Sequence, residues 1–319
     1  MIVGAGGPTL GAAMIVTRFA PSPTGHLHLG HVHSALAGWR AAREAGGRFL
    51  LRVEDIDPQR CRPAFETALV EDLDWLGLHR DGPVRRQSEH LDDHAAALRR
   101  LAAAGLAYPC FCSRRAVEAE IARAGGAPHG PEGPHYPGTC RSLTAGERAA
   151  RIAAGAPHAW RLDATAAGAH AGAATFDDAL AGRIRADPAV LGDVVIARRD
   201  VPTSYHLAVV VDDAIQGVTL VTRGEDLLPA THVHRLLQAA LGLPVPAYAH
   251  HPLLRGADGV RLSKRDGALA VRALRAAGRT PSEVLAQAGG GTGLTPEFGT
   301  GPRRREEAPS GAVGRTDGQ

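Results

Sequence analysis

The stretch from Thr17 to His31 constrains the fold of this chain more than any other. Ile15 to Phe19 predicts a short strand, which ends because Pro21 and Pro23 cannot donate hydrogen bonds to a strand ladder. A helix is expected to begin near Leu27, because small and apolar residues then recur at helical spacing. These residues are Leu29, Val32, Ala35, Leu36 and Trp39. A strand that turns sharply into a helix presents unpaired N–H groups and the positive end of the helix dipole, which together favour an anion such as phosphate.

Two histidines fall within the first turn of this helix. His28 and His31 are three residues apart, so that they share one face. Gly30 lies between them and leaves room for a flat ligand against the backbone. We interpret the pair as part of a nucleotide site. The alternative is a solvent-facing helix that carries histidines by chance, since the chain has 16 of them.

The composition indicates a globular protein of one large or two modest domains. The chain has 319 residues, of which 44% are hydrophobic, and no apolar run long enough to span a membrane. Residues 1–13 are small and rich in glycine, do not resemble a secretion signal, and are expected to form a disordered extension. Four cysteines are too few for a disulfide framework, which favours a reducing, cytoplasmic location.

Lys264 is the only lysine among the 36 basic residues of the chain. Lysine is a compact, mobile charge, whereas arginine is a planar fork, so a lone lysine is a candidate for a role that arginine fills poorly. Ser263 and Gly267 flank it in a short polar loop that could close over a phosphate chain. The alternative is an ordinary surface turn.

Acidic residues follow a second predicted strand. Phe49 to Val53 reads as a buried strand, and Glu54, Asp55 and Asp57 come directly after it. The carboxyl end of a strand is where open α/β sheets bind ligands. Because side chains alternate along a strand, we expect one of Glu54 and Asp55 to face the cleft.

Three of the four cysteines lie close together in the sequence. Cys110 and Cys112 form a tight pair, and Cys140 returns after a loop that is poor in apolar residues. Thiolates in such a setting predict a structural zinc site with four ligands. The fourth ligand is left open among Tyr136, His135 and His129. The alternative is three buried, reduced thiols.

The second half of the chain reads as rich in strands. We predict strands at Ala159–Leu162, Gly182–Ile184, Val194–Arg198, Leu207–Asp212 and Val218–Thr222, the last ending at Arg223. Two helices should follow. One is Ala230–Leu241, with His232, Arg235 and Gln238 facing solvent, and the other is Val271–Ala286, with breaks at Gly278 and Pro281.

Taken together, four motifs in order resemble the catalytic domain of glutamyl-tRNA synthetases, which are class I aminoacyl-tRNA synthetases with HIGH and KMSKS motifs. They are Arg18-Phe-Ala-Pro-Ser-Pro-Thr-Gly, His28-Leu-Gly-His31, Arg52-Val-Glu-Asp-Ile-Asp57 and Arg261-Leu-Ser-Lys264. Each motif alone would be weak, but their order makes the match specific. The resemblance spans Thr17 to about Ala286 and implies an α/β fold of the Rossmann type.

The resemblance also implies how the chain is divided. The Rossmann catalytic domain would have its first half at residues 14–107 and its second half at 161–250, with a small zinc-binding subdomain inserted at 108–160. A KMSKS-type loop and a short helical end would occupy 251–288. Residues 289–319 have almost nothing to bury and are expected to be a disordered tail.

The short C-terminal part resembles a truncated paralogous family, the glutamyl-Q tRNA(Asp) synthetases. Full-length glutamyl-tRNA synthetases continue with a long anticodon-binding region, whereas only 55 residues follow Lys264 here (319 − 264). The zinc pattern of the paralogues matches Cys110, Cys112, Tyr136 and Cys140, and their Leu-Ala-Val-Val-Val-Asp-Asp string matches Leu207–Asp213. His31 departs from the paralogues, in which this second histidine is often replaced.

This resemblance implies an enzyme that activates L-glutamate with ATP, and with Mg²⁺, in the absence of tRNA. The glutamyl group would then pass to queuosine in the anticodon stem-loop of tRNA(Asp). ATP would contact His28, Gly30, His31 and Lys264, and the catalytic residues would be the two histidines and the lysine. Glutamate would contact Arg18, Ser22, Glu54, Tyr205 and Arg223.

Other functions stay open. The chain could be a truncated glutamyl-tRNA synthetase that charges the 3′ end of tRNA(Glu), or a synthetase-like protein that binds tRNA without catalysis. A ligase that loads glutamate onto a carrier protein is a third possibility. In each case we expect a cytoplasmic monomer that carries one zinc ion.

Overall fold

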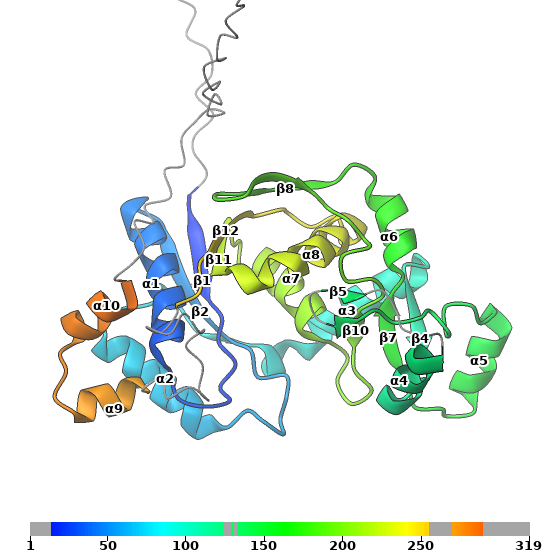
Figure 1. Ribbon diagram of the computed structural model, residues 1–319, viewed down its shortest axis with the longest axis horizontal. Coiled ribbons are helices and arrows are strands. Elements are labelled where there is room, and N and C mark those ends of the chain that lie inside the picture. Colours follow the sequence, from blue (N-terminus) through cyan, green and yellow to red (C-terminus); the bar gives the residue numbers. More distant parts are fainter. Residues whose placement is uncertain (1–13, 124–128, 131–132, 255–269, 290–319) are drawn as a thin grey trace, which may run out of the picture.

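The computed structural model describes residues 14–123, 129–130, 133–254 and 270–289 (Figure 1). Its strands are β1 (Val16–Phe19), β2 (Arg48–Val53), β3 (Arg85–Arg86), β4 (Ala107–Cys110), β5 (His129–Gly130), β6 (Gly133–Pro134), β7 (Ala159–Leu162), β8 (Thr175–Asp178), β9 (Gly182–Arg185), β10 (Val195–Ala197), β11 (Leu220–Gly224) and β12 (Ala247–His251). Its helices are α1 (Leu29–Glu44), α2 (Pro63–Trp75), α3 (Leu91–Ala103), α4 (Arg114–Arg123), α5 (Ala145–Ala153), α6 (Ala164–Ala171), α7 (Tyr205–Ile215), α8 (Leu228–Leu241), α9 (Val271–Ala276) and α10 (Pro281–Gly289). Two short 3₁₀ helices are η1 (Gln87–His90) and η2 (Glu225–Leu227).

Two groups of strands meet edge to edge at β1 and β11. The first half of the chain forms a parallel sheet in the order β1-β2-β3, and the second forms the order β11-β12-β8-β9, in which β12 is parallel to both neighbours. At the seam, Thr219 N donates to Val16 O at 2.9 Å, and Val16 N donates to Thr219 Oγ1 at 2.8 Å. The strand order runs outward in both directions from this seam, and such a switch point is where open α/β sheets bind ligands.

Helix α1 covers the seam. It begins at Leu29, two residues after the predicted start near Leu27, and His28 is its N-cap residue. Gly38 brings the helix close to both strands: Thr17 Oγ1 donates to Gly38 O at 2.8 Å, and a Cβ at position 38 would lie 2.8 Å from Thr222 Oγ1. A larger residue would therefore push α1 away from the ends of β1 and β11.

The core is divided between the two ends of the molecule. One buried cluster joins α1, β2 and α2 with α9 and α10, and includes Phe49, Leu69 and Val271. A second joins α3, α6, α7 and α8, and includes Leu101 and Leu237. Figure 1 shows the same division, with α1, α9 and α10 at one end, α7 and α8 in the middle, and α4 and α5 at the other end.

The prediction of a strand at Leu207–Asp212 is wrong, because these residues lie in α7. The β-branched run Val209–Val211 favours a strand by propensity. However, consecutive residues of α7 from His206 to Asp213 are all buried. A helix that is buried on every side has no amphipathic period from which to recognise it. Strand β8 was not predicted.

The predicted exposed face of α8 is also wrong in part. His232 and Gln238 are 9% and 3% exposed, because α3, α6 and α7 pack against the helix. His232 Nδ1 accepts a hydrogen bond from Asp187 N at 3.0 Å, and Gln238 Nε2 donates to Tyr248 Oη at 2.9 Å. The predicted break in the C-terminal helix is confirmed, since α9 ends before Gly278 and α10 begins at Pro281.

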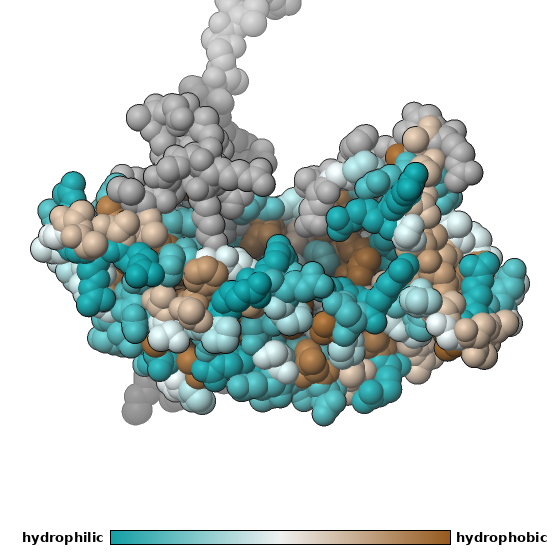
Figure 2. Space-filling model, turned by 90° about the horizontal axis from the view of Figure 1, so that it is seen from below, coloured by the Kyte–Doolittle hydropathy of each residue, from teal (hydrophilic) through white to brown (hydrophobic). Residues whose placement is uncertain are grey.

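Three predictions fall on residues that the structure does not describe. The extension at 1–13, nearly all of the tail at 289–319 and the loop that carries Lys264 lie outside the described residues. On the described face in Figure 2, hydrophilic side chains dominate and hydrophobic ones form small, separated patches. Among the helices of the described ranges, none is long and apolar enough to cross a membrane.

Candidate active site

A cleft of about 510 Å³ opens at the carboxyl ends of β1 and β11. Its walls come from the segment after β1, the first turn of α1, the start of α7 and the segment after β11. Eight of the residues predicted for catalysis or substrate binding line this one cleft: Arg18, Ser22, His28, Gly30, His31, Glu54, Tyr205 and Arg223. The ninth, Lys264, lies outside the described residues.

Two histidine rings stand at the first turn of α1. His28 Nδ1 accepts a hydrogen bond from Gly30 N at 3.1 Å, and His31 Nδ1 accepts one from His28 N at 3.3 Å. The rings stack with their centroids 3.8 Å apart. Because both Nδ1 atoms accept, each neutral ring carries its proton on Nε2. Two such donors at the positive end of a helix dipole suit phosphate oxygens.

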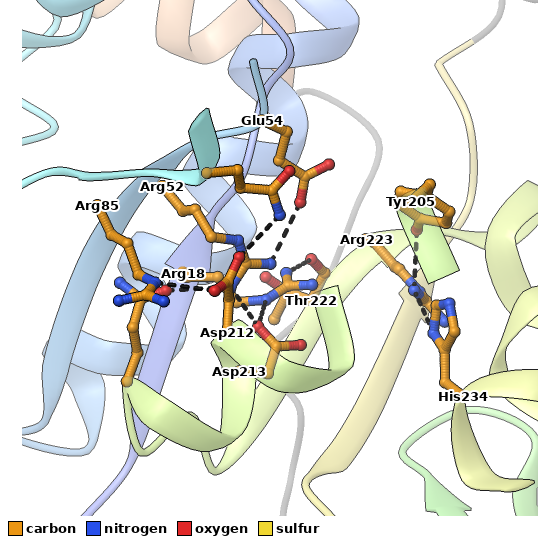
Figure 3. Close-up of polar contacts among 12 residues, drawn as sticks. Arg18, Arg52, Glu54, Arg85, Tyr205, Asp212, Asp213, Thr222, Arg223 and His234 are labelled. Carbon is orange, nitrogen blue, oxygen red and sulfur yellow. Dashed lines mark hydrogen bonds and ion pairs between the residues drawn. The ribbon is translucent and has the colours of Figure 1, made fainter. Parts of the chain in front are cut away.

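Arg18 and Arg52 share one carboxylate at the seam (Figure 3). Arg18 Nε donates to Asp213 Oδ1 at 3.0 Å, and Arg52 Nη1 donates to the same oxygen at 2.6 Å. Burial alone would raise the pKa of Asp213, but the two guanidiniums hold it below its usual value. Asp213 is therefore a fixed anion that orients both arginines.

Glu54 completes this group. Arg52 Nη2 donates to Glu54 Oε1 at 3.2 Å, while no hydrogen bond to Oε2 is formed within the described ranges. Burial raises the pKa of Glu54, and Arg52 opposes that shift. A ligand cation at Oε2 would hold the side chain ionised. Asp55 instead accepts hydrogen bonds from Ser88, so Glu54 is the acid that faces the cleft.

Arg223 differs from the other two arginines in its partners. Its Nη1 donates to Tyr205 Oη at 3.2 Å and to His234 Nδ1 at 3.3 Å (Figure 3). Its Nε donates to His250 Nε2 at 3.0 Å. Its Nη2 donates to Thr231 Oγ1 at 2.6 Å. None of these partners is charged, and no carboxylate of the described residues pairs with Arg223.

The seam therefore carries an excess of positive charge. Three guanidiniums face two carboxylates there, and 3 − 2 leaves one positive charge, which resides on Arg223. Asp226, which also lines the cleft, lies beyond β11 in η2 and has a partner of its own. Because Arg223 is 6% exposed, it is poorly hydrated and favours an anionic ligand group.

Comparison with known protein families matches residues 14–300 to the tRNA synthetases class I (E and Q), catalytic domain. The chain belongs to this family. A match over most of the chain accounts for the order of the four motifs, three of which contribute residues to the cleft within the described ranges. The synthetase fold predicted from the motifs, α/β with a parallel sheet, is thereby confirmed.

Individual relatives of this synthetase carry two kinds of name. The chain is 50% identical to the glutamyl-Q tRNA(Asp) synthetase of Rhodobacter capsulatus, over 85% of this chain and 98% of the relative. It is 42% identical to the glutamate–tRNA ligase of Aquifex aeolicus, over 85% of this chain but 56% of the relative. A crystal structure of a glutamate tRNA ligase from Elizabethkingia meningosepticum, in complex with its amino acid, superposes with a TM-score of 0.68 and 32% identity. That match covers 79% of this chain and 52% of the ligase, so the synthetase spans about half the length of the solved ligase.

The predicted metal ligands of the synthetase come together at the other end of the molecule. The Sγ atoms of Cys110, Cys112 and Cys140 lie within 4.8 Å of one another, and the pair Cys112–Cys140 is 3.5 Å apart. Tyr136 Oη lies 3.5 Å from the Sγ atoms of Cys110 and Cys112. Sulfurs that share a tetrahedral Zn²⁺ at about 2.3 Å lie roughly 3.8 Å apart, so the spacing fits.

The surroundings of the sulfurs also suit a cation. Burial raises the pKa of Cys112 to about 11, so without a cation this thiol would stay protonated. Phe111 N donates to Cys140 Sγ, and Arg161 Nε donates to Cys110 Sγ, both at 3.4 Å, as donors do toward thiolates. Of the other candidate ligands, His135 contacts Val190 O instead, and the side chain of His129 lies outside the described part.

Several residues around the cleft were missed by sequence reasoning. Asp213 was quoted only as the last residue of the Leu207–Asp213 string, directly after a predicted strand, and was given no role. In α7, neighbouring residues point about 100° apart, so that Asp213 meets Arg18 and Arg52 while Asp212 accepts hydrogen bonds from Arg85 and Gln87. The signal in the sequence that could have identified Asp213 was the Asp212-Asp213 pair at the end of an apolar run.

The residues that hold Arg223 had no signal in the sequence. His250 lies in β12, and Thr231 and His234 lie in α8. They meet only because β11, α8 and β12 fold around one guanidinium. The chain's 16 histidines gave no reason to prefer these two.

Proposed function

We propose that this synthetase activates L-glutamate with ATP without tRNA and then transfers the glutamyl group to queuosine in the anticodon of tRNA(Asp). The observation that carries the proposal is Arg223, a buried guanidinium that faces the cleft with only neutral partners. The names and lengths of relatives such as that of Rhodobacter capsulatus support the choice of acceptor.

Glutamate brings two carboxylates and one ammonium, a net charge of −1 that complements the excess charge of the seam. Arg223 and Arg18 each take a carboxylate, and the free Oε2 of Glu54 takes the ammonium. Tyr205 accepts a hydrogen bond from Arg223, so its own hydroxyl proton is available to a carboxylate oxygen. Ser22, in the segment after β1, lines the same cleft.

In the first step, an oxygen of the glutamate α-carboxylate attacks the α-phosphorus of ATP. An O–P bond forms, the bond to the β-phosphate breaks, and pyrophosphate leaves. His28 and His31 donate to phosphate oxygens, Gly30 leaves room for the nucleotide, and Lys264 adds a mobile charge, with Mg²⁺ as the expected companion of ATP. Such a reaction needs positioning and charge stabilisation more than covalent help from the protein.

In the second step, a hydroxyl of the queuosine cyclopentene ring attacks the carbonyl carbon of the adenylate. An ester C–O bond forms, AMP leaves with the electrons of the broken anhydride bond, and the hydroxyl proton is released. The acceptor must reach the same cleft, because the activated carbonyl is held there by Arg18, Arg223 and Glu54.

We also propose that one Zn²⁺ is bound by Cys110, Cys112, Cys140 and Tyr136. Support comes from the spacing of the three sulfurs and of the tyrosine oxygen. When bound, the ion would supply a structural crosslink and neutralise buried thiolates. It lies outside the cleft and takes no part in the two chemical steps.

The test is to locate the esterified glutamate on tRNA. The protein is incubated with ATP, radiolabelled glutamate and tRNA(Asp) that carries queuosine, with unmodified tRNA(Asp) and tRNA(Glu) as matched acceptors. We expect label only on the queuosine-containing tRNA(Asp), and we expect it to survive removal of the 3′-terminal nucleotide.

Label that is lost with the 3′ end would favour a truncated ligase of the kind that charges tRNA(Glu). A protein that exchanges pyrophosphate into ATP with glutamate but labels no tRNA would point to another acceptor, such as a carrier protein. Absence of any glutamate-dependent exchange would exclude the activation step itself and leave a non-catalytic tRNA-binding protein.

A further inference from the structure

The partners of Arg223 fix the protonation of the imidazoles around it. A guanidinium has five N–H donors and no acceptor, so any nitrogen facing it must carry a lone pair. His250 Nε2 faces Arg223 Nε at 3.0 Å and therefore accepts. The proton of His250 then resides on Nδ1, which donates to Asp178 Oδ2 at 2.7 Å. Asp178 is thus separated from Arg223 by one neutral ring.

The same reasoning fixes the tautomer of the second imidazole, that of His234. His234 Nδ1 accepts from Arg223 Nη1 at 3.3 Å, so its proton is on Nε2, which donates to His206 Nδ1 at 3.3 Å. All three histidines are at least nine-tenths buried. Burial and the charge of Arg223 lower the pKa of His234 well below its ordinary value and that of His206 to about 4. Both rings are therefore neutral at pH 7.

Asp178 is held firmly in its place behind His250. Its Oδ1 accepts hydrogen bonds from the backbone N–H groups of Leu180 and Ala181, and its Oδ2 accepts from the backbone N of His250. The carboxylate therefore fixes the tautomer and the orientation of the His250 ring. It does so without contacting Arg223 itself.

We propose that His234 and His250, the latter backed by Asp178, are positioning residues that hold Arg223 toward the cleft while leaving its charge free for a substrate carboxylate. This inference rests on the proposed activation of glutamate and deepens it. It assigns the selection of glutamate over glutamine to side chains that contact neither of these amino acids. A carboxylate in direct contact would orient Arg223 equally well, as Asp213 orients Arg18, but it would compete with the substrate.

The test compares His234→Asn with His234→Asp. Both side chains are short enough to place an oxygen near the position of Nδ1, and they differ in one charge. The steady-state KM for glutamate, the KM for ATP and the relative kcat/KM for glutamate and glutamine are measured by pyrophosphate exchange. Wild-type exchange is established first, because its absence would contradict the proposed function rather than this inference.

We expect His234→Asn to keep the KM for glutamate within about threefold of wild type, since a neutral acceptor is retained. His234→Asp should raise that KM by about thirtyfold or more and lower the preference for glutamate over glutamine by at least about tenfold. The KM for ATP should stay within about twofold in both variants. Equal glutamate parameters in the Asn and Asp variants would overturn the proposal.

His232→Asp is the matched control for a new carboxylate on α8. His232 is buried on the same helix and contacts Asp187 N rather than Arg223. Its variant should keep both KM values within about twofold of wild type. If this control lost glutamate affinity as strongly as His234→Asp, the effect would be one of folding and the proposal would be wrong.

The tautomers of the two histidines can also be measured on the wild-type protein, so that this test does not depend on a variant that folds. Two-dimensional NMR of protein labelled with ¹⁵N in histidine distinguishes the two neutral tautomers and the imidazolium. We expect His250 as the Nδ1–H tautomer and His234 as the Nε2–H tautomer at pH 7. An imidazolium, or the opposite tautomer, at either position would contradict the inference even if the kinetics agreed.

Discussion

At the level of single residues, the three buried arginines at the seam differ in whether they have an ionic partner. Arg18 and Arg52 are bound to Asp213, whereas Arg223 is bound to imidazoles and hydroxyls. A guanidinium whose charge is already matched orients the site. One whose charge is unmatched lacks its counter-ion until the substrate supplies it. The two arginines proposed to bind glutamate therefore contribute unequally.

We predict that Arg223→Ala lowers kcat/KM for glutamate by at least about a hundredfold, because the substrate carboxylate would be left buried without a cation. Arg223→Lys should recover only part of that loss, since an ammonium cannot reproduce the planar fork. Pyrophosphate exchange at varied glutamate measures both. Arg235→Ala serves as the control, because Arg235 lies in α8 and donates to Thr175 O. Normal exchange in Arg223→Ala would rule out its role.

At the level of elements, the first turn of α1 has a structural task, and we propose a chemical task for it as well. His28 caps the helix through its Nδ1, and the same ring stacks on His31 in the wall of the cleft. An N-cap side chain contributes about 1 kcal/mol to helix stability. The two tasks can be separated, because asparagine caps a helix well but has no imidazole.

We expect His28→Asn to retain thermal stability close to wild type and to lose activity by about a hundredfold in kcat. His28→Ala should lose both activity and about 1 kcal/mol of stability. Thermal unfolding and pyrophosphate exchange on the same preparations distinguish these outcomes. If His28→Asn were as active as wild type, the ring would be a cap and nothing more.

The cysteine cluster brings together β4 and the segment before α5, so a bound metal would crosslink these two parts of the chain. We predict that protein purified without added zinc contains one equivalent of the metal, and that Cys110→Ser contains about a tenth of that or less. Metal analysis by mass spectrometry measures the content. Cys61→Ser is the control, because Cys61 lies apart from the cluster and contacts Glu54 O. Equal metal in both variants would contradict the zinc site.

At the level of the whole molecule, buried neutral histidines make stability depend on pH. Burial lowers the pKa of His206 and of His251 to about 4. In the unfolded chain each ring binds a proton at pH values below about 6.5, while the folded chain resists protonation down to about 4. The contribution of each neutral ring to the free energy of unfolding is therefore complete above pH 6.5 and is lost as the pH falls from 6.5 to 4. Asp212, whose pKa is lowered to about 2 chiefly by His94 and Arg52 against the effect of burial, loses its contribution only between about 3.8 and 2.

We predict that the free energy of unfolding falls between pH 6.5 and 4, by up to about 3 kcal/mol for each of the two rings. Urea unfolding at a series of pH values measures the slope. His206→Leu should reduce that slope by up to about 1.4 kcal/mol per pH unit, whatever its effect on stability at pH 7.5. A slope that is unchanged in this variant would show that His206 does not resist protonation in the folded protein.

Local patterns in the sequence identified most of the cleft. The prolines that end β1, the small and apolar spacing of α1 and the paired histidines are interactions within a few residues of each other, and such interactions can be read along the chain. At the end of β2, strand alternation reduced the choice of the acid that faces the cleft to Glu54 or Asp55, and the family resemblance then favoured Glu54.

Tertiary structure alone decided what holds the arginines. Leu207–Asp212 reads as a strand but forms part of a helix, because packing on all sides overrides the propensity of its valines. Asp213 and His250 meet Arg18 and Arg223 across 195 and 27 positions of the chain, and side-chain charge carries no information about such distant partners. The sequence by itself thus determined which chemical groups line the cleft, whereas the fold determined which of their charges are neutralised and which one is left for a substrate.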